Sequence, residues 1–117
     1  MDLAQASGAH TEWKVKLRMA IAKREDTDAA TISRDDCCAL GKWLHGEAKS
    51  KYSKLKAYST CLTQHAAFHR EAGAVATTIN RKDYAKAEKM LDAGTPYATV
   101  SSSVITAILG LKKEAGL

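Results

Sequence analysis

The stretch YSKLKAYSTCLTQHAAFHREAGAVATTIN, residues 52–80, carries the most regular apolar pattern in the chain. Apolar residues and two histidines recur there at alternating steps of three and four: Leu55, Tyr58, Leu62, His65, His69, Ala72, Ala76 and Ile79. Such steps place side chains on one face of an α-helix, so the stretch is predicted to form a long helix from Tyr52 to Asn80. A face of this length is typical of a helix inside a bundle.

Apolar stripes of the same period indicate further helices at about residues 3–23, 83–93 and 96–113. Asp83 is an expected N-cap, and Thr95 with Pro96 has the pattern of an N-cap and a first helical residue. Gly94 is expected to end the helix before them, and the last two helices are close enough to act as one kinked helix.

The polar segment KREDTDAATISRDD, residues 23–36, is expected to be mostly a loop, and so is HGEAKSKYS, residues 45–53. Between these connections a short helix is predicted over Arg34–Leu40, with Ser33 as its N-cap and Gly41 ending it. No useful β-alternation is present, so we predict an all-α fold. Its architecture is expected to be an antiparallel four-helix bundle with an additional short helix that carries cysteines.

Length and composition narrow the function classes. The 117 residues are predicted to form one domain over residues 1–117, and no apolar run is long enough for insertion into a membrane. The net charge is +5, but the basic residues are dispersed without an aromatic platform, which does not favour nucleic-acid binding. Three cysteines without a secretory signal favour a reducing, cytoplasmic location.

The two histidines on the long helix are the main functional signal. His65 and His69 are four residues apart, which brings both imidazoles to one point, and His10 holds a third stripe position on the first helix. Core histidines that are hydrogen-bonded to neighbours are the alternative. Three such histidines with a spare thiol favour a metal site, because burying three imidazoles without a shared partner is costly.

Three histidines and one thiolate would close a tetrahedral zinc shell, with copper(I) as the second choice. A closed shell leaves no position for water, so an enzyme is not expected. Cys61 lies on the same helix as the histidine pair, and a row of three ligands there would span about 12 Å, too far for one ion. Cys61 is therefore predicted to be a core residue, and the short helix with Cys37 and Cys38 is expected to supply the thiolate.

Three motifs resemble the signature motifs of the chemoreceptor zinc-binding (CZB) domain family. They are HTEW at residues 10–13, CALGKWL at residues 38–44 and HAAFH at residues 65–69, and the later MLDAGTPY and Ser101–Ser103 also resemble this family. Only Cys38 fits the family frame, since Cys37 is one residue out of register. The resemblance therefore implies His10, Cys38, His65 and His69 as the ligands of one Zn²⁺.

The resemblance also implies a cytoplasmic sensory domain, commonly a homodimer, attached to bacterial chemoreceptors or diguanylate cyclases. The sequence contains no recognisable output module, so we expect the chain to be either a free-standing copy or a domain cut from a longer one. The expected function is transmission of zinc occupancy to a signalling output. Two alternatives are sensing of hypochlorous acid through oxidation of Cys38, and a structural zinc-stabilised dimerisation module.

Other motif residues are expected to surround the site. Gly41 would allow a sharp turn after the thiol, and aromatic residues would wall the site from water: Trp13, Trp43 and Phe68. Asp35 and Asp36 would either orient a histidine N–H or cap a helix. His45 is expected to be a solvated surface residue.

Overall fold

The computed structural model describes residues 1–117. The chain folds into seven helices and has no strand, which confirms the all-α prediction. They are α1 (Leu3–Lys23), α2 (Ala29–Ile32), α3 (Ala39–His45), α4 (Glu47–Tyr52), α5 (Lys56–Asn80), α6 (Tyr84–Met90) and α7 (Pro96–Ala115).

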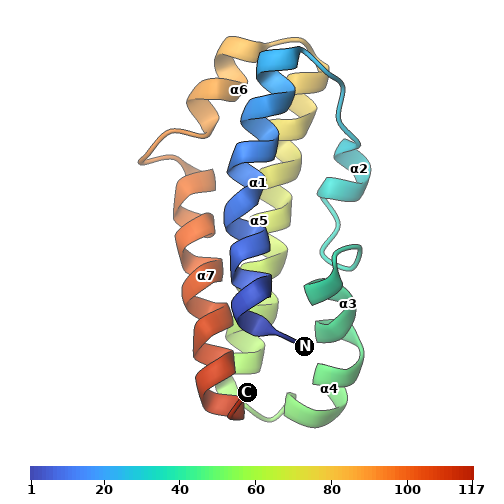
Figure 1. The fold of residues 1–117 in the computed structure, drawn as a ribbon, viewed down its shortest axis with the longest axis vertical. Helices are drawn as coiled ribbons and strands as arrows, with labels where there is room; N and C mark the ends of the chain where they lie inside the picture. Colours follow the sequence, from blue (N-terminus) through green and yellow to red (C-terminus); the bar gives the residue numbers. More distant parts are fainter.

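The long helices α1, α5 and α7 lie side by side, and the short helices α2, α3 and α4 follow one another along a fourth side (Figure 1). In this view the chain rises along α1, descends through α2–α4, rises along α5 and descends through α6 and α7. The helical bundle is thereby confirmed, and its fourth column is three short helices instead of one rod. We call α2–α4 the short-helix column.

Local capping explains most helix ends. The side chain of Asp2 accepts a hydrogen bond from the Gln5 N–H and begins α1, where no cap was predicted. The predicted caps Asp83 and Thr95 begin α6 and α7, and Pro96 is the first residue of α7. Helix α6 ends at Met90 and not near residue 93 as predicted, and Gly94, with a φ of +81°, lies in the turn between α6 and α7.

Two predicted boundaries around the long helix are wrong. Residues 47–52 form α4 instead of a loop, and α5 begins at Lys56 instead of Tyr52. Leu55 has extended backbone angles, and its N–H donates to the Tyr52 carbonyl oxygen at 2.9 Å. This turn ends the short-helix column and starts α5 in the opposite direction.

The predicted short helix over Arg34–Leu40 is also wrong. Residues 29–32 form α2 inside the predicted loop, Ser33 ends that helix, and residues 34–38 are turns and bends. Cys38 is the extended N-cap of α3, which runs through Gly41 without stopping there. Asp28 explains why a helix forms at residues 29–32: it is the N-cap of α2, and its carboxylate accepts a hydrogen bond from the Thr31 N–H at 3.2 Å.

The apolar faces of the long helices, together with a few residues of the short helices, form one core of 21 buried residues. Phe68 and Val75 of α5, Leu17 of α1 and Ile108 of α7 are among its fully buried members. Cys61 is fully buried in this core, as predicted. None of the helices combines the length and apolar character that crossing a membrane requires.

Candidate metal centre

Four side chains from three segments converge between α1, α5 and the start of α3. His10 comes from α1, His65 and His69 come from α5, and Cys38 precedes α3. One ligand atom of each residue lies within 4.8 Å of the others. The structure therefore brings together all four residues that the sequence motifs singled out as ligands.

Four of the six donor–donor separations within this cluster lie near the edges of a coordination tetrahedron. The Cys38 Sγ lies 3.2 Å from the His65 Nε2, 3.6 Å from the His69 Nε2 and 3.8 Å from the His10 Nε2. The two Nε2 atoms of His65 and His69 are 3.0 Å apart. Ideal zinc bond lengths give N–N edges of about 3.3 Å and N–S edges of about 3.6 Å. The donor set and its spacing therefore fit Zn²⁺.

Backbone carbonyls orient two of the three imidazoles. The His10 Nδ1 lies 2.8 Å from the Ala6 carbonyl oxygen, and the His69 Nδ1 lies 2.9 Å from the Ile32 carbonyl oxygen. A carbonyl only accepts, so each Nδ1 carries the proton and each Nε2 lone pair faces the cluster. The His65 Nδ1 is buried without a partner.

The loop before α3 presents the thiol. The Gly41 N–H donates to the Cys38 Sγ at 3.3 Å, in the manner of a helix N-cap. A Cβ at Gly41 would lie 1.8 Å from the carbonyl oxygen of Asp35. The sharp turn predicted at Gly41 is thus wrong: this glycine lies inside α3 and lets the preceding loop approach the helix.

Burial keeps the cluster uncharged when no cation is bound. Desolvation lowers the pKa of His10 and His69 and lowers that of His65 to about 3. Burial also raises the pKa of the Cys38 thiol, against backbone N–H groups that lower it. The imidazoles are therefore neutral at physiological pH, which is the form that binds a metal, and a bound cation would favour the thiolate.

The predicted surroundings are only partly where they were expected. Phe68 is fully buried, and its ring centroid lies 5.3 Å from that of His10 and 5.4 Å from that of His69. Trp13 lines a pocket together with His10 and Cys38. The Trp43 ring packs on Tyr52, at 6.0 Å between centroids.

The two aspartates do not take the predicted roles. Asp35 pairs with the His45 Nε2 at 3.0 Å, and Asp36 binds the Arg34 guanidinium through two hydrogen bonds of 3.0 Å. The ring N–H groups of His10 and His69 bind backbone carbonyls instead. Sequence reasoning missed these carbonyls, because every residue type has one and only the fold selects which approaches a histidine. His45 is exposed, as predicted, although it is paired.

Two hollows in the surface differ in their relation to the cluster. A pocket of about 360 Å³ lies between the first turns of α1 and the start of α3, and Cys38 and His10 belong to its wall. We call it the access pocket, lined among others by Gln5, Ala9, His10, Trp13, Cys38 and Leu40.

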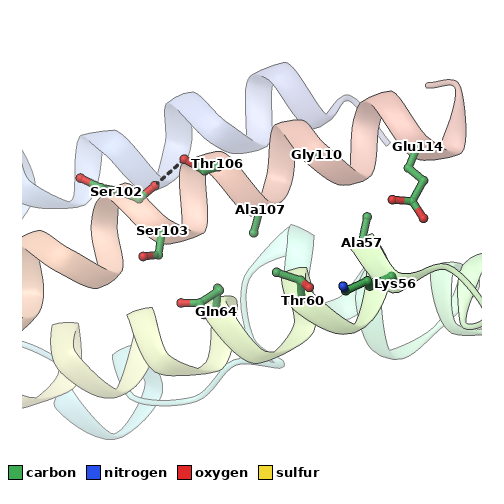
Figure 2. Close-up of a pocket in the computed structure, with 10 residues that line it drawn as sticks. All are labelled: Lys56, Ala57, Thr60, Gln64, Ser102, Ser103, Thr106, Ala107, Gly110 and Glu114. Carbon is green, nitrogen blue, oxygen red and sulfur yellow. Dashed lines mark hydrogen bonds between the residues drawn. The ribbon is translucent and has the colours of Figure 1, made fainter.

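The second hollow is a groove of about 500 Å³ between α5 and α7 (Figure 2). Figure 2 shows small and polar side chains along it, with Lys56 and Glu114 at one end. It contains no histidine or cysteine, and nothing in its lining resembles a metal site.

The fold and the cluster define a helical-bundle protein with a four-donor, histidine-rich metal centre. The family model of the chemoreceptor zinc-binding domain (CZB) matches residues 10–76, more than half of the chain, and this range includes the whole cluster. The chain belongs to the CZB family, which is a family of sensory zinc-binding domains, and its cofactor is Zn²⁺. Neither a curated protein nor a solved structure is significantly similar to it.

Proposed function

We propose that the chain is a zinc sensor that binds one Zn²⁺ through His10, Cys38, His65 and His69. The presence or absence of zinc at this site would be transmitted to a signalling output, either a chemoreceptor or a diguanylate cyclase. The observation that carries this proposal is the convergence of three segments on one set of donor atoms that lie within 4.8 Å of one another. The family match supports the sensory role.

The bound ion would supply four coordinate bonds that join α1, α5 and the loop before α3. His10 and His69 are already oriented by backbone carbonyls, so little rearrangement of these rings is needed for binding. The ion would join the Cys38 loop to α5, so the position of this loop relative to α5 would depend on occupancy. An attached output domain would then respond to the changed rigidity of the bundle.

Metal analysis of matched cysteine variants tests the ligand set. Cys38→Ala is expected to lower zinc affinity by more than about 100-fold, because it removes a donor and not merely a supporting hydrogen bond. Cys37→Ala is the matched control, since it removes a neighbouring thiol that lies outside the cluster. Equal zinc affinity for Cys38→Ala and the parent, measured by competition with a chelator, contradicts the assignment.

We further propose that the chain works in the cytoplasm as a homodimer and has no catalytic activity. Three free thiols suit a reducing compartment. Exposed apolar side chains on the long helices, Val15, Met19 and Leu109, are compatible with a partner copy. Sedimentation of the zinc-loaded and zinc-free protein at several concentrations tests dimerisation, and a monomer throughout contradicts it. The expectation of no catalytic activity rests on the ligand set, because four protein donors would leave no open position on the ion for a reacting water.

A second candidate function is oxidant sensing at Cys38. It is favoured by one observation: Cys38 is only partly buried and borders the access pocket, whereas the three histidines are buried. In this reaction the thiolate and hypochlorous acid yield a sulfenic acid and chloride, which removes one donor from the site. Titrating zinc at fixed oxidant, and then oxidant at fixed zinc, separates the two signals. Zinc exchange slower than any cellular response would favour a structural dimerisation module over both.

A further inference from the structure

The donor atoms of the metal centre are largely closed off from solvent. His65, His69 and His10 are 0%, 2% and 3% exposed, and the Phe68 ring packs against the rings of His10 and His69 from inside the core. An ion that arrives from solvent therefore needs either a preformed passage or a local opening of the bundle.

The access pocket is the hollow that reaches the cluster. Two of the four cluster residues belong to its wall, His10 from α1 and Cys38 from the start of α3, and the His10 Nε2 lies 3.8 Å from the Cys38 Sγ. A second hollow of about 330 Å³ lies between α5 and the loop before α3, but none of the cluster residues lines it. The groove between α5 and α7 and the hollow beside α6 contain none of them either.

We infer that the access pocket is the passage through which Zn²⁺ enters and leaves the centre, and that Cys38 and His10 are the ligands that it meets first. This inference rests on the proposed function, since it concerns the loading of the same centre. The pocket volume of about 360 Å³ equals that of roughly twelve water molecules in the liquid, at about 30 Å³ each. An ion can thus keep water ligands inside the pocket until protein donors replace them.

The charges of the pocket wall bear on the rate of entry. The Lys16 Nζ lies 4.9 Å from the centre of the Trp13 ring, and both residues belong to the wall. Asp2 has the opposite charge, but its carboxylate already accepts the Gln5 N–H as the cap of α1. The Lys16 ammonium therefore opposes an approaching cation, and its removal should speed entry.

Filling the pocket tests the inference through exchange rates. Ala9 lines the pocket and Ala4 does not, although both are exposed residues of α1. Ala9→Phe should slow zinc association and dissociation alike, each at least about tenfold, and keep the dissociation constant within about threefold, because an obstacle raises the barrier without changing the two end states. Ala4→Phe should leave both rates within about twofold, since the path stays open. Gln5→Phe is a second filling variant that should act like Ala9→Phe.

Reversing the charge of Lys16 provides an independent test. Lys16→Glu should raise the association rate several-fold at low ionic strength, and the increase should shrink in high salt. Lys14→Glu is the matched control, because Lys14 is exposed on the same helix but does not line the pocket, and its increase should be clearly smaller. Equal increases in the two variants would count against a passage beside Lys16.

The alternative is loading through a local opening that releases the loop with Cys38. Exchange by such an opening accelerates in urea below the unfolding transition, whereas exchange through a preformed passage is nearly insensitive to urea. Stopped-flow mixing of the zinc-free protein with Zn²⁺ gives the association rate, and transfer of zinc from the loaded protein to an excess of chelator gives the dissociation rate. Parental rates in both filling variants, or a steep dependence on urea, would overturn the inference.

The proposed function and the passage fail in different ways. A parent protein that does not bind zinc refutes the proposed function and removes the passage with it. Parental affinity together with parental exchange rates in the filling variants overturns only the passage, because the affinity depends on the donors and the exchange rates depend on the route.

Discussion

Acidification is expected to destabilise the zinc-free protein through its buried histidines. Burial lowers the pKa of His10, His65 and His69 in the folded chain, and that of His65 falls from 6.5 to about 3. In the unfolded chain these groups bind protons near pH 6.5, so the unfolded state takes up more protons than the folded state below that pH. The stability is fully present above about pH 6.5 and is lost as the pH falls towards the folded pKa values.

The size of the effect follows from the same linkage. Each histidine that stays neutral in the folded state costs about 1.4 kcal/mol per pH unit below its unfolded pKa. Integrated from about pH 7 to about pH 5, the loss is about 2 kcal/mol for His65 alone, and the lowered pKa values of His10 and His69 act in the same direction. Small domains are stable by about 5–15 kcal/mol, so this loss is a measurable fraction of the stability of the zinc-free protein.

Urea denaturation followed by far-ultraviolet circular dichroism, after treatment with a chelator, measures this loss. Replacing His65 by Gln should reduce the pH dependence by about 2 kcal/mol over the same range, because one proton-binding site is removed. Replacing the exposed His45 by Gln is the matched control and should preserve it. An unfolding free energy that stays constant between the two pH values would refute the idea that neutral, desolvated imidazoles form the centre.

Three further predictions concern the supports of the site. Gly41→Ala should lower both the melting temperature and the zinc affinity, because its Cβ would lie 1.8 Å from the Asp35 carbonyl oxygen, whereas Gly8→Ala, where nothing lies within 4 Å, should lower neither. Gly73→Ala should weaken zinc binding, since its Cβ would lie 1.9 Å from the Ser33 Oγ, and Ser33→Gly should restore it in part, because the Ser33 Cα would still lie 2.9 Å from that Cβ; no recovery at all argues against the contact. Zinc affinity measured by competition should fall as the pH drops below the raised pKa of the Cys38 thiol, because binding as a thiolate releases its proton, and a flat profile across neutral pH would argue against a thiolate ligand.

Sequence patterns predicted the long helices well because the signals are local. The three- and four-residue steps require only an α-helix with one buried face, and Asp83 and Thr95 cap the helices that follow them with their own side chains. The short helices α2 and α4 have four and six residues, too few for a period to show. Tertiary contacts fix that part of the chain instead. One example is the pair of hydrogen bonds between the Asn80 side chain and the Thr27 backbone, which joins the loop after α1 to the end of α5.

The side chains of the site could be predicted from the sequence, because residue types and their spacing identify them. The spacing of His65 and His69 identified the pair, and the family motifs singled out Cys38 rather than Cys37. The supporting atoms were not predictable, since they are main-chain groups: the carbonyls that orient two rings and the N–H that faces the thiol. The glycine at position 41 was recognised as part of the motif. The reason that a glycine is needed there is the close approach of the Asp35 backbone, which only the folded chain reveals.

The contacts of the cluster indicate which part of the bundle would change its structure when zinc binds or leaves. The long helices α1, α5 and α7 supply most of the 21 buried residues of the core, and the short-helix column adds only Leu40, Leu44 and Ala48. The short-helix column consists of helices of four to seven residues, which are not stable in isolation and depend on what they contact. Two of its contacts belong to the centre: Cys38 begins α3, and the Ile32 carbonyl at the end of α2 accepts the ring N–H of His69. We therefore expect the column, and not the three-helix core, to be the part of the bundle that changes when zinc binds or leaves.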